Sequence, residues 1–145
     1  MPEPQQEAFS RRTLAVLMED KPGVLSHVSH LFRRRNYNIE SLTVGHSETP
    51  GISRMTVVVR ANDAVLEQVI KQLYKLINIT KVSDITEDDA VIRELALIKV
   101  HCPSSQRGDV KQLVDIFRAS IIDVAHESMT IEITGTETKV DSLIE

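Results

Sequence analysis

Residues 12–45 read RTLAVLMEDKPGVLSHVSHLFRRRNYNIESLTVG. The stretch opens with a continuous apolar run over residues 13–19, which is typical of a central strand buried on both faces. Pro22 and Gly23 then interrupt the chain. Beyond them the apolar residues recur at helical spacing, which predicts a helix that ends at a run of three arginines. A second strand is expected over residues 38–46.

The next residues complete a β-α-β-β-α-β order. Residues 53–60 alternate between apolar and polar side chains, as a strand with one buried face does. Asn62 or Asp63 is expected to cap a helix whose apolar stripe ends at Ile77, and residues 78–86 are expected to form a strand. This order predicts a ferredoxin-like fold, in which two helices back four antiparallel strands.

The pattern then restarts after an acidic linker at residues 87–91. The expected elements are, in order, a strand over 93–101, a loop over 103–108, a helix over 110–117, strands over 121–125 and 129–134, and a helix capped by Thr136. A closing strand has no counterpart, so the second domain is expected to be incomplete. The sequence thus predicts an α+β protein with a disordered tail at residues 1–11 and two ferredoxin-like domains, at residues 12–86 and 92–145.

Composition and charge argue against several classes of function. Lys and Arg number 17 against 21 Asp and Glu, and a net charge of -4 does not favour a nucleic acid partner. Cys102 is the only cysteine and forms no internal disulfide, which indicates a reducing compartment. No apolar run approaches the roughly 20 residues of a membrane-spanning helix, and residues 1–10 do not resemble a secretion signal. A soluble, intracellular protein is expected.

Side chains that could carry out catalysis are few. His101 and Cys102 are neighbours on an expected strand, so they point to opposite faces and do not form a nucleophile–base pair. His27 and His30 have a helical spacing that some metal sites use, but no third ligand is evident. The arginine run over residues 33–35 is either a solvated helix end or a contact for RNA or a phosphate.

The turn between the first strand and the first helix offers a ligand site. A helix start presents free N–H groups and a positive dipole end, which suit a carboxylate, and Gly23 lets the ligand approach. Asp20 is able to accept hydrogen bonds from an ammonium group, and Asn38 offers both a donor and an acceptor. Together these groups fit a free α-amino acid, although a loop that leads into a helix is also common in proteins without such a site.

These residues also carry a resemblance to a known family. Residues 12–45 resemble the start of the regulatory subunits of acetolactate synthase, an ACT-domain family. The resemblance continues in SRMTVVV (residues 53–59), LEQVIKQLYKLINITKV (66–82), RELALIKV (93–100) and FRASIIDVAHESMTIEITGT (117–136). It covers nearly all of the chain after Arg11, in the family's order and spacing.

The resemblance implies a chain with no catalytic activity and no cofactor of its own. Such chains bind a large catalytic subunit, which makes acetolactate or acetohydroxybutyrate from pyruvate with thiamine diphosphate, magnesium and FAD. They activate this subunit and confer feedback inhibition by a branched-chain amino acid, most commonly valine. A bacterial cytoplasm is the expected location, with a plastid stroma as the alternative.

The resemblance also implies where the effector binds. ACT domains pair side by side as a homodimer, and the effector lies at the interface. The expected contacts are Asp20, Gly23, Val24 and Leu25 of one subunit and Asn38 and Ile39 of its partner.

Two departures from the family concern the turn and the end of the chain. Many relatives have Gly where this chain has Asn36, which also tolerates a left-handed conformation. Relatives usually extend beyond the position of Glu145, which is why the second domain is expected to be truncated.

The alternatives are an ACT-type sensor of another biosynthetic enzyme, an enzyme that uses Cys102 or the histidines, and an RNA-binding sheet. The third lacks the aromatic platform on which bases stack.

Overall fold

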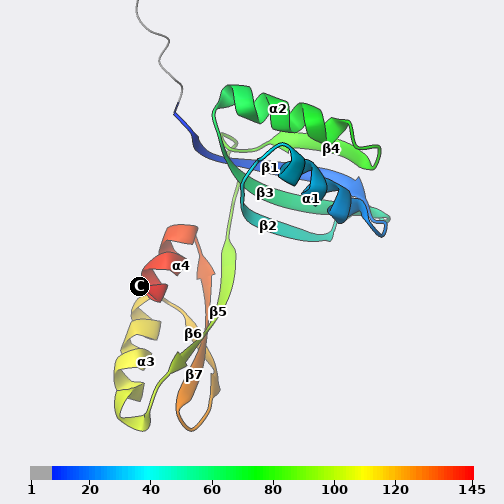
Figure 1. Ribbon diagram of the computed structural model, residues 1–145. Helices are drawn as coiled ribbons and strands as arrows, with labels where there is room; N and C mark the ends of the chain where they lie inside the picture. The colour runs from blue at the N-terminus through cyan, green and yellow to red at the C-terminus, as the bar shows by residue number, and fades with distance from the viewer. Residues whose placement is uncertain (1–7) are drawn as a thin grey trace, which may run out of the picture. The chain divides into compact units, whose positions relative to one another are not determined.

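The computed structural model describes residues 8–145 (Figure 1). The chain divides between Asp89 and Ala90 into two compact units. The first unit contains β1 (Ser10–Glu19), α1 (Val24–Arg34), β2 (Ile39–His46), β3 (Ile52–Ala61), α2 (Asp63–Tyr74) and β4 (Ile79–Asp84). The second contains β5 (Glu94–His101), the 3-10 helix η1 (Ser104–Gln106), α3 (Arg107–Ile116), β6 (Ser120–Val124), β7 (Ser128–Gly135) and α4 (Glu137–Ile144).

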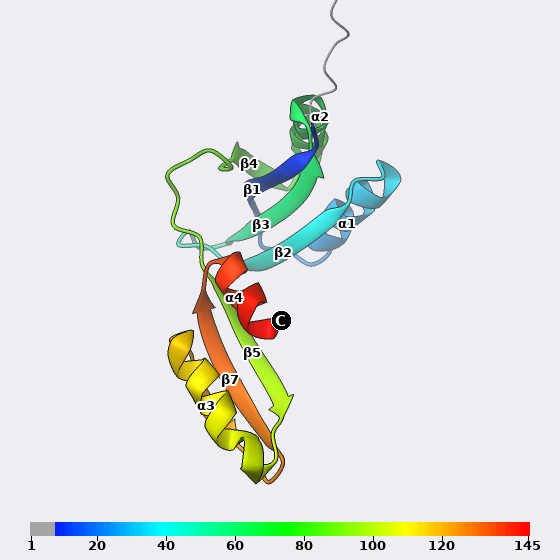
Figure 2. The same ribbon diagram turned by 90° about the vertical axis from the view of Figure 1, so that its left-hand side faces the viewer.

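The first sheet has the strand order β2-β3-β1-β4, which can be followed in Figure 2. Strand β1 pairs antiparallel with both β3 and β4, and β2 pairs antiparallel with β3. The prediction of a ferredoxin-like unit is therefore confirmed. Strand β1 begins at Ser10, inside the stretch expected to be a disordered tail; residues 1–7 of that stretch lie outside the described part.

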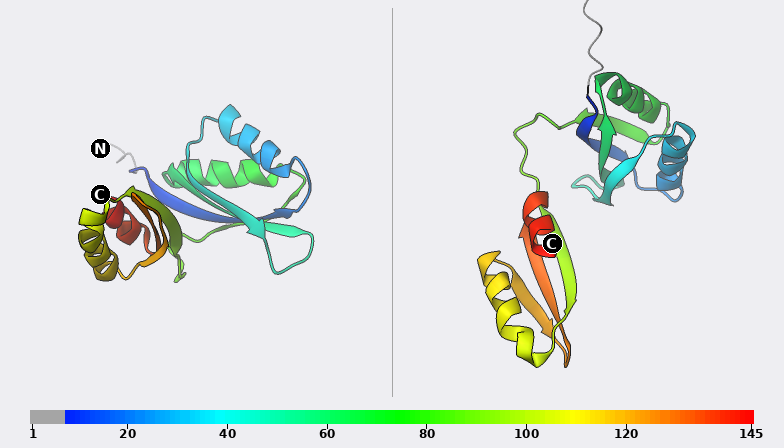
Figure 3. Two further views of the ribbon diagram at one scale, coloured as in Figure 1. Left: turned by 90° about the horizontal axis from the view of Figure 1, so that it is seen from below. Right: turned by 60° about the vertical axis from the view of Figure 1, so that its left-hand side comes forward.

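The core of the first unit lies between the sheet and its two helices. Leu14, Val16 and Met18 of β1 are at most 2% exposed, and α1 and α2 lie on their side of the sheet (Figure 3). The side chains of β1 that alternate with them, including Ala15 and Leu17, are only half-buried. The prediction that this strand is buried on both faces is therefore wrong for the single chain, because both helices cover the same face.

The helix ends agree with the capping signals of the sequence, except at the end of α2. Asn36 has the left-handed φ of 56° expected of it, and Asn62 caps α2 by accepting a hydrogen bond from the N–H of Val65 at 2.9 Å. The apolar stripe expected to end at Ile77 stops earlier, and Ile77 is 91% exposed. The chain leaves the helix after Tyr74, so the helical spacing no longer applies and Leu76 packs against the core instead.

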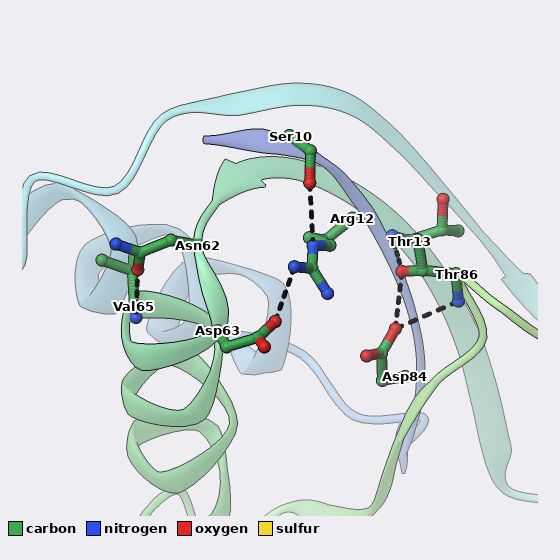
Figure 4. Close-up of polar contacts among 8 residues, drawn as sticks. All are labelled: Ser10, Arg12, Thr13, Asn62, Asp63, Val65, Asp84 and Thr86. Atoms are coloured by element: carbon green, nitrogen blue, oxygen red, sulfur yellow. Dashed lines mark hydrogen bonds and ion pairs between the residues drawn. The ribbon is translucent and has the colours of Figure 1, made fainter. Parts of the chain in front are cut away.

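Polar contacts tie the start of β1 to the start of α2 and to the end of β4 (Figure 4). The guanidinium of Arg12 donates to Ser10 at 3.0 Å and forms an ion pair with Asp63, the first residue of α2, at 2.6 Å. The N–H of Thr13 donates to the hydroxyl of Thr86 at 3.0 Å, and that hydroxyl donates to Asp84 at 2.6 Å. These contacts fix β1 beside α2 on one side and β4 on the other.

The second unit has a three-stranded sheet of order β5-β7-β6, with α3 and α4 on one face (Figure 3). Its core contains Met129, Ile131 and Ile133 of β7, which are at most 4% exposed, whereas Leu95 and Leu97 of β5 are 62% and 60% exposed on the other face.

Two predictions for the second unit have different outcomes. The loop expected over residues 103–108 ends earlier, because η1 leads directly into α3 at Arg107. Thr136 caps α4 as predicted and accepts a hydrogen bond from the N–H of Lys139 at 3.4 Å.

We predict that Phe32→Ala lowers the free energy of unfolding of the first unit by about 3–5 kcal/mol, as truncations of a buried aromatic ring do. Phe32 is 2% exposed, and its ring packs edge-on against Tyr37 at a centroid distance of 5.9 Å. Ile77→Ala is the matched control, expected to cost under about 0.5 kcal/mol because that side chain is exposed. Urea unfolding followed by circular dichroism measures both, and similar losses would contradict the placement of the core.

Candidate functional site

The turn after β1 is held by backbone hydrogen bonds. The N–H of Asp20 donates to the carbonyl of Gly51 at 2.9 Å, and the N–H of Lys21 donates to that of Glu19 at 3.0 Å. Gly23 ends the turn with a φ of +85°, which disfavours any residue with a side chain. A Cβ added at Gly23 would meet no atom within 4 Å, so the turn faces open space.

The start of α1 has free hydrogen-bond donors. The N–H of Val24 reaches the carbonyl of Lys21 at 3.4 Å, and that of His27 reaches the carbonyl of Gly23 at 3.0 Å. Within residues 8–145, the N–H groups of Leu25 and Ser26 have no acceptor, and no side chain caps the helix. Because the first turn also contains no acidic residue, the positive end of the helix dipole is unopposed. This end of the helix can therefore bind a carboxylate.

Asp20 lies beside this helix start and is partly engaged. One of its carboxylate oxygens is 3.1 Å from Nδ1 of His46, and the Asp20 side chain is 44% exposed. An ionised carboxylate accepts several hydrogen bonds, so Asp20 keeps capacity for an ammonium group.

The neighbouring lysine does not compete for Asp20. The ammonium of Lys21 contacts Glu19 at 2.6 Å, and the amide of Asn78 donates to the same carboxylate at 3.2 Å. The hydrogen bond from Lys21, followed by that from Asn78, lowers the pKa of Glu19 below its ordinary value. With Lys21 held by Glu19, the ammonium of a ligand would have access to Asp20.

The structure places the predicted site residues in different surroundings. Val24 is 5% exposed and belongs to the core, so it could meet a ligand only through its backbone. Leu25 is 43% exposed and offers an apolar surface. Asn38 is exposed, and its side chain has no hydrogen-bond partner within the described residues, whereas Ile39 packs partly against the core.

Asn38 and Ile39 do not lie near Asp20 in the same chain. Ile39 pairs with Val59, at the level where β1 begins, whereas His46 pairs with Ser53, at the level where β1 ends. The seven steps from Ile39 to His46 span roughly 23 Å at the usual rise of a strand. One chain therefore holds two separate parts of the predicted site, at opposite ends of its sheet.

Sequence reasoning missed the residues that surround Asp20. His46 was not among the residues predicted for the site, yet it contacts Asp20. The predicted order of elements could have revealed this contact. Two parallel strands joined by a helix finish at the same end of a sheet, so the last residue of β2 lies near the turn after β1. Nothing in the sequence pattern identified the pair formed by Glu19 and Asn78.

The other chemical candidates do not assemble a site within the described residues. Cys102 is fully buried, and only its own neighbour's carbonyl, that of Pro103, lies within hydrogen-bond range of the sulfur. In residues 8–145 no three His, Cys, Asp or Glu side chains are grouped so that they could hold a metal ion. None of the helices described here is long and apolar enough to cross a membrane.

Two family models match the chain. A model described as AHAS small subunit-like ACT domain matches residues 14–81, and a model described as small subunit of acetolactate synthase matches residues 93–145.

Named relatives and a solved structure agree with these models. A probable acetolactate synthase small subunit of Archaeoglobus fulgidus is 57% identical over 135 residues, which cover 93% of this chain and 84% of the relative. The acetolactate synthase small subunit of Mycolicibacterium smegmatis is 54% identical, and the alignment covers 91% of this chain and 78% of the relative. The crystal structure of an acetolactate synthase small subunit from Thermotoga maritima matches with a TM-score of 0.87 at 45% identity. The match covers 93% of this chain and 84% of that chain.

We predict that acid weakens the folded state of the wild type more than that of Glu19→Gln. Because the folded pKa of Glu19 is lowered, its contribution to stability is present above the ordinary value of 4.5 and is lost as the pH falls through the lower folded value. Thermal unfolding measured from pH 6 to pH 3 should show the two proteins converging at the acid end, and parallel profiles would contradict the pairing of Glu19 with Lys21.

Proposed function

Because the chain belongs to the acetolactate synthase small-subunit family, we propose that it activates a large catalytic subunit and confers feedback inhibition by valine. The family implies that large subunit as a partner. In this proposal the chemistry belongs to the large subunit, with thiamine diphosphate, magnesium and FAD bound there. This chain contributes an amino acid sensor and a surface that transmits its state.

One observation carries the proposal: the open helix start beside Asp20 can recognise both charges of a free amino acid. The free N–H groups of Leu25 and Ser26 suit the carboxylate, and Asp20 suits the ammonium. The open space at Gly23 gives the ligand room to approach. The exposed Leu25 offers an aliphatic contact, which favours an amino acid such as valine over a polar one.

The edge of the first sheet supports pairing with a second copy. Every residue of β2 after Ile39 is exposed, and Leu42 and Val44 are 42% and 39% exposed although they pair with the buried Val57 and Met55. The strand contains no Lys and no Pro, which commonly protect an exposed edge from pairing. We therefore propose that β2 pairs antiparallel with β2 of a second copy, so that the two sheets become one.

This pairing would complete the site. In an antiparallel pair, the start of β2 in one copy lies beside the end of β2 in the other. Asn38 of one copy would then lie near His46 and Asp20 of its partner, although the two positions are far apart within one chain. The free amide of Asn38 would add a donor and an acceptor for the amino acid, and Ile39 an apolar contact.

Inhibition further requires that the amino acid distinguish two states of the assembly. A ligand that binds both states equally shifts nothing, however tightly it binds. A site shared by two copies meets this requirement naturally, because a change in the angle between the copies alters the distance between its two halves.

Valine binding tests the effector site. Calorimetry with the full chain should show saturable binding of valine, and Asn38→Ala should weaken it about tenfold, the effect of losing about 1.4 kcal/mol of hydrogen bonding. Gln68→Ala removes an exposed amide from α2 and serves as the matched control. If valine does not bind, or if both variants bind it equally well, the site is not the one proposed.

The oligomeric state tests the edge pairing. Val44→Lys places a charge on the exposed edge of β2 and should convert a dimer into a monomer that keeps its fold. Ile116→Lys makes the same change at a side chain of α3 that is 74% exposed, and it should leave the dimer intact. Light scattering after size-exclusion chromatography distinguishes the two results; a dimer that persists in Val44→Lys contradicts pairing through β2.

A further inference from the structure

The outer side of α1 gathers cationic and histidine side chains. His27, His30, Arg33 and Arg34 occur at spacings of three and four, so they share one stripe of the helix. The helix contains no Asp or Glu. The helix dipole accounts for the two arginines in the last turn.

These four side chains are unpaired in the part of the chain that the structure describes. Most of the other cations of the first unit face carboxylates, in the pairs Arg11–Glu40, Arg12–Asp63, Lys21–Glu19, Arg54–Glu48, Arg60–Glu40 and Lys71–Glu67. Lys75 and Lys81 are exceptions among the described residues. Arg35, next to the stripe, donates to the side-chain oxygen of Gln72 at 3.1 Å. The stripe is therefore a local excess of positive charge on a chain whose net charge is -4.

The stripe also lines a hollow. The four side chains and Leu76, which follows α2, line an open cavity of about 500 Å³. This volume lies within the range of roughly 300–1,000 Å³ of small-molecule sites. A concave surface favours a small ligand over the flat face of another protein.

We propose that this cavity binds a small molecule with two or more anionic groups, either phosphates or carboxylates. The guanidinium groups of Arg33 and Arg34 can each form paired hydrogen bonds with such a group, and their charge does not depend on pH in the physiological range. His27 and His30 add ring N–H donors further along the helix. This ligand differs in charge from the zwitterionic amino acid at the start of α1 and occupies a different face of the helix.

Calorimetry at low ionic strength tests the site with two probes, inorganic tripolyphosphate and citrate. The wild-type chain should bind at least one of them saturably, and Arg33→Ala/Arg34→Ala should weaken that binding about tenfold or more, the loss of at least one charge-assisted contact. The control Arg54→Ala/Lys111→Ala removes the same charge from two exposed side chains outside the cavity and should bind like the wild type. His27→Ala/His30→Ala, which leaves the last turn of the helix unchanged, provides a second variant.

Each outcome decides the proposal. Binding of tripolyphosphate alone identifies a phosphate ligand, and binding of citrate alone identifies a carboxylate ligand. Absence of saturable binding of both probes overturns the proposal, as does an equal loss in the cavity variant and in its charge-matched control. Weaker association of Arg33→Ala/Arg34→Ala with the large subunit, without anion binding by the wild type, would show that the stripe is a protein contact and would also overturn it.

Discussion

Strand β1 is hydrogen-bonded along both edges, to β3 and to β4, and this constraint positions the rest of the first unit. Its buried side chains anchor both helices to one face of the sheet, so the chain has little freedom where the strand ends. The turn that carries Asp20 and Gly23 follows directly, and the backbone contact between Asp20 and Gly51 holds it against the loop before β3. The candidate site is therefore a turn on a rigid support, which would favour recognition of a small ligand.

Strand β2, at an edge of the same sheet, has the opposite character. Its residues are exposed, and its two ends carry the two halves of the predicted site, Asn38 at the start and His46 beside Asp20 at the end. In the proposed dimer this site is split between two copies, so ligand binding and dimerisation would be thermodynamically coupled. A ligand that contacts both copies would stabilise their pairing, and pairing would in turn supply the second half of the site.

The sequence predicted what short-range rules control. The order of elements, the caps at Asn62 and Thr136 and the left-handed Asn36 follow from periodicity and local hydrogen bonding. The features that the sequence did not predict depend on tertiary structure. Ile77 continues the helical spacing of α2, but it lies beyond the end of that helix, which no local sequence signal marks. The apolar sequence of β1 does not show whether one face of the strand is covered or both. The contact between Asp20 and His46 depends on the alignment of two strands and not on either segment alone.

Helix α1 connects the two proposed ligand sites. Its N-terminus carries the donors for a carboxylate, and its outer stripe lines the cavity, over a length of roughly 16 Å. Four of its residues are buried in the core, so the helix moves as a body and not residue by residue. If an anion in the cavity and an amino acid at the helix start favour different positions of α1, each must change the affinity of the other by the same factor, because coupling between binding sites is reciprocal. If both favour the same position, each must strengthen the binding of the other, again by one common factor.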